Sequence, residues 1–275
     1  METQQLEILP QPGSIGAEVR GVDLSTELPE AIKSQLREAF NRYGYLLFRG
    51  QELSGEDQKR VGSIFGTISY QGENYKESDG TRYISNVAED GLNKDGELSF
   101  HIDHSFYATP LRAIMLYALE APPPGAGGET MLSSMKLAYD ALPAATRERL
   151  EGLEALHCYD FDVSRNVRQA DRFREKDLGP LSTRATHPVV LTHPDTGEKV
   201  LFISRRHVDR IIGLEEAESE ALLAELTAAI EAPERVVKHQ WLPGDLVIFD
   251  NLKLQHARTN FDPSHRRHLR RCQVM

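Results

Sequence analysis

Apolar residues recur along the chain with two different spacings, which predict a few helices among many strands. Between Pro29 and Tyr43, the residues Ile32, Leu36 and Phe40 stand four positions apart, as on one face of a helix. Short apolar runs, typical of buried strands, follow at 45–48, 111–119, 189–191, 200–203 and 246–249. Further strands are expected at 98–107, at 236–237 and downstream of position 265.

Helix signals are concentrated near the N-terminus and in the segments between strands. Ser54 with Asp57 resembles the capping pattern of a helix that should end near Gly66. Other helices are expected at 135–142, 144–156 and about 215–232, and residues 193–197 are typical of a hairpin turn. This order favours a mainly β fold with flanking helices, a jelly-roll core (a double-stranded β-helix) or a barrel, over a doubly wound sheet.

The length and composition predict one domain that spans residues 1–275. A chain of 275 residues with 40% hydrophobic content can bury a substantial core, and all-β domains reach this length. Residues 160–185 are rich in Asp, Arg and Ser and have little periodicity. Two interpretations of this segment stay open, a mobile lid or insertion over a site and a disordered surface loop.

Charge and cysteine content exclude several classes of protein. A net charge of -10 gives little electrostatic reason for binding nucleic acid, so the arginines near the C-terminus indicate a small anion instead. Cys158 and Cys272 are the two cysteines, which argues against a disulfide framework. The sequence has neither a signal-peptide pattern nor an apolar run long enough for a bilayer. We expect a cytoplasmic protein with a small-molecule partner and no membrane partner, and a homo-oligomer stays open.

Three His-x-acid triplets compete as candidate metal ligands. With 10 His and 42 acidic residues, chance alone gives roughly one or two such triplets, so the triplet by itself is weak evidence. His193 to Asp195 falls in the predicted hairpin turn, which explains it without a metal. The triplet from His207 to Asp209 has arginines on both sides, which favours a strand end or a solvated surface.

The triplet from His101 to Asp103 differs in its surroundings. Phe100 and Ile102 give it a buried strand context, and a Gly-Gly-x-Thr segment follows at 127–130. On a strand, alternate side chains share a face with Cα atoms about 6.6 Å apart, so His101 and Asp103 could converge on one metal. Two imidazoles and one carboxylate form the ligand set of mononuclear non-haem iron sites. The alternative is a buried imidazole that hydrogen-bonds to Asp103.

The third ligand is expected downstream, where the chain meets a known pattern. Residues 241–251 predict a turn, a strand and a loop that deliver His256. With the segments 21–24, 48–51, 65–66, 187–189 and 192–194, this pattern resembles the taurine dioxygenase-like (TauD/TfdA) family of Fe(II)/2-oxoglutarate-dependent oxygenases over nearly the whole chain.

The resemblance implies a role for each matching residue. His101, Asp103 and His256 would be the iron ligands and the catalytic centre, which leaves three positions for 2-oxoglutarate and O2. Thr130 and Arg267 match the residues that hold the far carboxylate of 2-oxoglutarate, which arginine can grip with two charge-assisted hydrogen bonds.

The C-terminal arginines differ in the face of the strand that they occupy. If Arg267 points inward, strand alternation places Leu269 and Arg271 on its face and Arg266 and Arg270 on the other. By resemblance, Arg271 is the arginine that meets the substrate's anionic group in taurine enzymes. The alternative is that Arg271 supports the cosubstrate or a neighbouring carboxylate.

The sequence departs from the taurine enzymes at several positions. The segment 67–73 lacks the histidine that those enzymes use on the sulfonate, so taurine is a poor candidate. Glu97 replaces an asparagine and would suit a cationic or amino-bearing substrate, unless it is a surface carboxylate. His207 stands about where the family often has an aromatic residue facing the substrate, and Leu252 replaces a common arginine.

The resemblance also implies the reaction. An unactivated C-H bond of a small polar metabolite, with amino-acid-derived compounds among the candidates, would be oxidised while 2-oxoglutarate is converted to succinate and CO2. Hydroxylation is the default outcome, and desaturation or cyclisation are alternatives. Halogenation is disfavoured because Asp103 keeps the carboxylate ligand. A non-oxidative metal-binding β-barrel protein or isomerase and a ligand-binding module with a vestigial site are the competing hypotheses.

Overall fold

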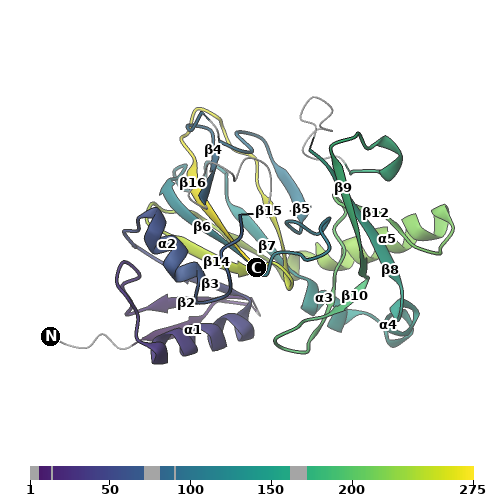
Figure 1. Cartoon of the computed structure of the whole chain (residues 1–275), viewed down its shortest axis with the longest axis horizontal. Helices are drawn as coiled ribbons and strands as arrows, with labels where there is room; N and C mark the ends of the chain where they lie inside the picture. The colour runs from purple at the N-terminus through teal and green to yellow at the C-terminus, as the bar shows by residue number, and fades with distance from the viewer. Residues whose placement is uncertain (1–5, 14, 71–80, 90, 162–171) are drawn as a thin grey trace.

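Two β-sheets build the core of the computed structural model, which describes residues 6–13, 15–70, 81–89, 91–161 and 172–275 (Figure 1). The larger sheet contains, in spatial order, β1 (Glu7–Pro10), β2 (Ala17–Arg20), β3 (Tyr45–Phe48), β14 (Leu246–Asp250), β6 (Ala113–Glu120), β16 (His268–Val274) and β4 (Thr81–Ser85). The smaller sheet contains β13 (Val236–His239), β7 (Thr130–Ser134), β15 (Leu254–Arg258) and β5 (Leu98–His101).

Side chains from both sheets share one hydrophobic cluster, as the two layers of a jelly roll require. Leu116 of β6 and Val247 of β14 belong to this cluster together with Leu132 of β7 and Leu254 of β15. The strands of the larger sheet are apolar on both faces, since Ile248, next to Val247, joins a second cluster on the other side. The predicted mainly β fold with a jelly-roll core is therefore confirmed.

Two N-terminal helices cover the outer face of the larger sheet, beside β3 and β14 in Figure 1. They are α1 (Glu30–Tyr43) and α2 (Gly55–Gly62). Helix α1 buries Leu36 and Phe40, as the four-residue spacing predicts. Ser54 and Asp57 form a capping box at the start of α2, but this helix ends at Gly62 and not near Gly66.

The remaining elements pack together beside the smaller sheet, on the right of Figure 1. They are α3 (Met135–Ala141), α4 (Ala144–Leu150), α5 (Glu216–Ile230), a sheet of β12 (Val208–Ile211), β8 (Glu154–Asp160) and β9 (Ser182–Pro188), the hairpin of β10 (Val190–Thr192) and β11 (Lys199–Leu201), and 3-10 helices at Glu175–Asp177 and Pro233–Arg235. The predicted hairpin turn at 193–197 is confirmed. The predicted helix at 144–156 is too long, because Gly152 adopts a positive φ of 75° and the chain continues as β8.

The segment 160–185, predicted as a lid or a surface loop, is described in part. Residues 162–171 lie outside the described residues, whereas Glu175–Asp177 is a 3-10 helix and β9 starts at Ser182. Across the described ranges, none of the helices has the length and apolar character that a bilayer crossing requires.

Candidate metal centre and cosubstrate site

His101, Asp103 and His256 come together at the edge of the smaller sheet. His101 is the last residue of β5 and pairs directly with His256 of β15 in the strand register. Asp103 Oδ1 lies 3.5 Å from His101 Nε2 and 3.9 Å from His256 Nε2. One potential ligand atom from each of the three residues lies within 4.8 Å of the other two. Of the three triplets, the one that the sequence favours, His101 to Asp103, is therefore the one that lies beside His256.

The prediction that one strand carries both ligands is wrong. Strand β5 ends at His101, and Asp103 lies in the turn that follows. Ile102, between them, is fully buried in another hydrophobic cluster and anchors the start of this turn. The carboxylate therefore reaches the two imidazoles from a turn and not by strand alternation.

The local hydrogen bonds and charges prepare the three side chains as ligands. His101 Nδ1 lies 2.8 Å from the carbonyl oxygen of Ser99, to which it can only donate, so Nε2 keeps its lone pair. Burial, with the neighbouring His101 as a smaller cause, lowers the pKa of His256 to about 3. Burial alone would raise the pKa of Asp103, but the neighbouring His101, His256 and Arg271 hold it well below its usual value. Both groups are thus in their metal-binding forms at neutral pH.

Thr130 and Arg267 line the same cavity as His101, Asp103 and His256, which are called the clustered residues below. Thr130 opens β7 and is 3% exposed, and its Oγ1 accepts a hydrogen bond from Trp241 Nε1 at 3.0 Å. Arg267 directly precedes β16, is 2% exposed and donates from Nε to the carbonyl of Gly128 at 3.0 Å. Within the described part of the chain, Arg267 Nη1 is buried and has no hydrogen-bond partner. A buried donor of this kind is costly unless a ligand satisfies it.

The two glycines before Thr130 are required by close contacts. Gly127 and Gly128 have φ of 85° and 79°, in the region that favours glycine. A Cβ atom on Gly128 would lie 3.3 Å from Cδ of Arg267, and one on Gly127 would lie 2.0 Å from the carbonyl oxygen of Asn260. The segment is a tight loop, and its glycines also let the backbone approach the arginine that lines the cavity.

Arg258 lines this cavity as well and was not among the predicted residues. Its Nε donates to the carbonyl of Gly96 at 3.0 Å, and its Nη2 donates to the same oxygen at 2.7 Å. Burial lowers the pKa of Arg258 to about 10. This guanidinium is already engaged with the loop that leads into β5, which distinguishes it from Arg267. The clue in the sequence is an arginine two positions after His256 on one strand.

A second cavity of about 180 Å³ adjoins the clustered residues, and Arg267 is not among its described lining residues. It is lined by Arg82, Leu92, Asn93, Leu98, His101, Asp103, His104, Phe106, Tyr159, Phe161, Arg206, His207 and Arg271. Arg271 donates from Nη1 to Asp103 Oδ2 at 3.2 Å. The ring centroid of buried His207 lies 5.9 Å from that of His101. Of the predicted substrate residues, Arg271 and His207 thus lie beside the clustered residues.

Glu97 lies apart from them. It is exposed and directly precedes β5. Among the residues that the structure describes, it lines neither of the two cavities. Its position agrees with the alternative of a surface carboxylate.

The predicted alternation along the C-terminal strand is confirmed. Leu269 packs into the cluster between the two sheets, and Arg271 reaches Asp103. Arg270 points to the opposite face, where its Nε donates to Gln58 Oε1 at 2.7 Å. Arg266 pairs with Glu120 at the surface. The register thus separates the arginines near the clustered residues from those with structural partners.

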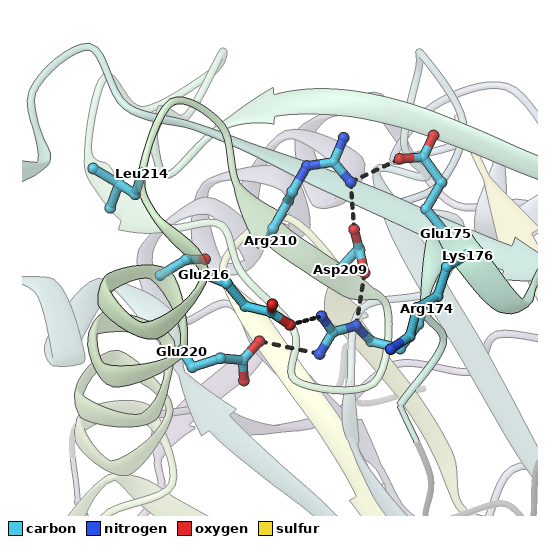
Figure 2. A pocket seen from close by; sticks show the side chains of 9 residues that line it. Arg174, Glu175, Lys176, Asp209, Arg210, Leu214, Glu216 and Glu220 are labelled. Carbon is cyan, nitrogen blue, oxygen red and sulfur yellow. Dashed lines mark hydrogen bonds and ion pairs between the residues drawn. The ribbon is translucent and has the colours of Figure 1, made fainter.

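The other two triplets have structural partners. His193 is fully buried, its Nε2 lies 3.1 Å from Asp250 Oδ2, and its Nδ1 accepts from the backbone N-H of Thr196 at 3.2 Å. Asp209 belongs to a cluster of ion pairs near α5, where Figure 2 shows it between Arg174 and Arg210. Because its charges are paired with one another, this cluster needs no ligand.

Comparison with known proteins decides the family. The model of the family described as "Taurine catabolism dioxygenase TauD, TfdA family" matches residues 7–273. The chain belongs to this family. Pentalenolactone F synthase from Streptomyces arenae is 31% identical over 96% of the chain and 94% of its own length. The (S)-phenoxypropionate/alpha-ketoglutarate-dioxygenase of Delftia acidovorans is 35% identical over 94% and 90%.

Solved structures of this family share the fold. A taurine dioxygenase from Burkholderia xenovorans has a TM-score of 0.80 at 29% identity and covers 98% of the chain and 90% of its own. A structure of AAD-2 in complex with Mn(II) and N-oxalylglycine has a TM-score of 0.83 at 27% identity, with coverage of 98% and 96%. The predicted family and enzyme class are therefore confirmed, and the chain is a 2-oxoglutarate-dependent dioxygenase of the TauD/TfdA family.

Proposed function

We propose that His101, Asp103 and His256 bind Fe(II). The observation that carries this proposal is the convergence of two imidazoles and one carboxylate within 4.8 Å. Their protonation states suit a metal, because the pKa of Asp103 is held low and Nε2 of His101 is left with its lone pair. Two histidines and one carboxylate leave open positions for other ligands, as iron oxygenases need.

We further propose that Thr130 and Arg267 hold the far carboxylate of 2-oxoglutarate. The buried Nη1 of Arg267 supports this role, because a carboxylate would satisfy it with a charge-assisted hydrogen bond. Thr130 Oγ1 already accepts from Trp241, so its own hydrogen can be donated to the same carboxylate. Arg267 and Thr130 line one cavity with the proposed iron ligands, as binding of one dicarboxylate by both the arginine and the metal requires.

When bound, the iron supplies the oxidation in which O2 converts 2-oxoglutarate to succinate and CO2 and hydroxylates an unactivated C-H bond. The protein's own residues fix the geometry of this reaction. Arg271 steadies the Asp103 carboxylate and faces the second cavity. His207 packs edge-on against His101, and burial lowers its pKa well below the usual value, so it stays neutral there. The substrate is thus held directly beside the iron ligands.

The second cavity supports a small organic acid with an apolar or aromatic body as the substrate. Arg82, Arg206 and Arg271 line it, against the single carboxylate of Asp103 among the described lining residues. Phe106 and Tyr159 stack with ring centroids 4.6 Å apart. This mixture suits an anionic head and a flat apolar body. Relatives named for phenoxypropionate and for 2,4-dichlorophenoxyacetate have such substrates, which agrees with the proposal.

We also propose a cytoplasmic location. Cys158 and Cys272 are both buried and are not joined in a disulfide, as is usual in a reducing compartment. The proposed ferrous iron needs the same reducing conditions. The proposed partner is the small-molecule substrate.

Succinate release tests the proposed function. The purified protein with Fe(II), 2-oxoglutarate and O2 is offered a panel of aryloxy, aryl and alkyl acids, and their amines serve as charge controls. We expect succinate to form only with all three components and to increase with an acid. Mass spectrometry should show one added oxygen in the product. This oxygen is found in the intact acid or, where it enters the carbon that bears an aryloxy group, in the oxo acid that separates from the phenol when that hemiacetal collapses. Succinate formation that persists without iron, or that increases equally with the amines, would contradict the proposal.

A further inference from the structure

The side chain of Asn251 forms hydrogen bonds with both backbone polar groups of Asp103. Asn251 follows β14 and is 0% exposed. Its Oδ1 accepts from the backbone N-H of Asp103 at 3.0 Å, and its Nδ2 donates to the carbonyl of Asp103 at 2.9 Å. The same Nδ2 donates to the carbonyl of Leu111 at 3.0 Å. One side-chain amide thus pairs with the backbone N-H and the carbonyl of Asp103. It also links Asp103 to Leu111, just before β6.

These hydrogen bonds replace the strand pairing that Asp103 lacks. His101 is fixed by its pairing with His256, whereas Asp103 lies two residues beyond the end of β5. Asn251 itself is rigidly placed, because its backbone N-H donates to the carbonyl of Arg112 at 3.1 Å. The position of the Asp103 carboxylate therefore depends on a side chain that is itself anchored in the larger sheet.

Asn86 holds the backbone of Arg267 in the same manner. Asn86 follows β4, the neighbour of β16. Its Oδ1 accepts from the backbone N-H of Arg267 at 2.9 Å, and its Nδ2 donates to the carbonyls of His265 at 2.8 Å and Pro263 at 3.1 Å. The backbone N-H of Asn86 donates to the carbonyl of Arg267 at 3.2 Å. Arg267 precedes β16, so these hydrogen bonds continue the pairing of β4 with β16 as far as Arg267.

We propose that Asn251 and Asn86 are positioning residues with separate tasks, Asn251 for the metal ligand Asp103 and Asn86 for the cosubstrate arginine Arg267. This inference rests on the roles proposed above for Asp103 and Arg267. Neither asparagine is among the described residues that line the cavity between Arg267 and Asp103. Each acts by fixing one backbone segment that lies outside regular strand pairing.

The two asparagines serve as controls for each other. Asn251→Ala and Asn86→Ala each remove one buried or partly buried amide that bonds to the backbone. Co(II), which is stable in air, is titrated calorimetrically into metal-free protein to give the metal Kd. 2-Oxoglutarate is then titrated into protein saturated with Co(II), and thermal unfolding is measured in parallel.

A crossed pattern is expected. Asn251→Ala should raise the Co(II) Kd about 10- to 100-fold, as is usual when a group that orients a metal ligand is removed. It should leave the 2-oxoglutarate Kd of the saturated protein unchanged. Asn86→Ala should raise the 2-oxoglutarate Kd about tenfold, because the Arg267 donors lose their alignment, and leave the Co(II) Kd unchanged.

A merely structural role would give a different result. Folded variants with both Kd values unchanged, or with both Kd values raised in parallel, would overturn the inference. If Asn251→Ala does not fold, Asn251→Ser and Asn86→Ser decide the matter, since serine keeps a small polar group and should give the same crossed pattern at smaller size. If the wild type binds Co(II) and 2-oxoglutarate but the variants do not show the crossed pattern, this inference alone is refuted. Wild-type protein that binds neither refutes the proposed function with it.

Discussion

Trp241 donates a hydrogen bond from Nε1 to Oγ1 of Thr130 at 3.0 Å, and both side chains are almost fully buried. The indole can only donate, so it fixes the Thr130 hydroxyl as a donor toward a third group. Trp241 belongs to the cluster between the two sheets. The core of the fold thus sets the direction of a hydroxyl that lines the proposed cosubstrate cavity.

Trp241→Phe should weaken binding of 2-oxoglutarate without removing an aromatic ring from the core. We expect a loss of about 1 kcal/mol, or about fivefold in Kd, which is typical of one buried hydrogen bond. Thr130→Val should weaken binding at least as much. In the double variant the two effects should not add, because both changes act through one hydroxyl. Additive losses in the titration would show that the two residues act independently.

Arg267→Ala should weaken 2-oxoglutarate binding by about 2–3 kcal/mol, roughly a hundredfold, because it removes a buried charged partner. Metal binding should stay unchanged, since Arg267 forms its hydrogen bonds with Asn86 and Gly128. Arg266→Ala is the matched control, because Arg266 pairs with Glu120 at the surface. The two variants are compared by titration of 2-oxoglutarate into metal-loaded protein. Equal affinities for the two would contradict the assignment.

Arg271→Ala should uncouple the reaction more than it weakens 2-oxoglutarate binding. Arg271 lines the second cavity and contacts Asp103 Oδ2. Under the proposed function, its removal leaves the anionic head of the substrate without a partner beside the proposed iron ligands. The measured quantity is the ratio of succinate to oxidised product, which should rise severalfold. A large loss of 2-oxoglutarate affinity with an unchanged ratio would instead place Arg271 in the cosubstrate site.

Acidification should destabilise the protein through His157. Burial lowers the pKa of His157 to about 3, so between that value and about 6.5 the unfolded chain binds a proton that the folded protein does not. Stability therefore falls as the pH is lowered through this window, by up to about 1.4 kcal/mol per pH unit for this residue. His157→Gln should reduce the slope of unfolding free energy against pH between pH 6.5 and 4.5, measured by denaturant titration. The same slope in both proteins would rule out this role.

The strands, and the triplet that lies beside a second histidine, could be predicted because their signals are local. The apolar run at 45–48 is buried on both faces, so hydrophobicity alone marks it as a strand. His101 stood out through its apolar neighbours, and the turn chemistry of His193 to Asp195 removed a competing triplet. Alternation along the C-terminal strand separated Arg271 from Arg270 because a strand period of two is strict.

The remaining features depend on contacts between residues far apart in the sequence. Asn251 and Asn86 hold segments 148 and 181 positions away, and no local pattern predicts such pairs. Arg258 lay outside the prediction because its partners are carbonyl groups of the loop before β5, which depend on chain geometry and not on residue type. Asp103 was placed on the strand because periodicity cannot show where pairing stops.

Metal affinity tests the central claim most directly, because two His-x-Asp triplets of this chain give opposite predictions. Asp103→Ala removes the carboxylate that lies 3.5 Å from His101 Nε2, whereas Asp195→Ala removes the carboxylate of the hairpin triplet. Calorimetric titration of anaerobic, metal-free protein with Fe(II) should give a single site in the wild type and in Asp195→Ala, and Asp103→Ala should weaken it by a factor of ten or more. Equal Fe(II) affinity in the two variants would contradict the account.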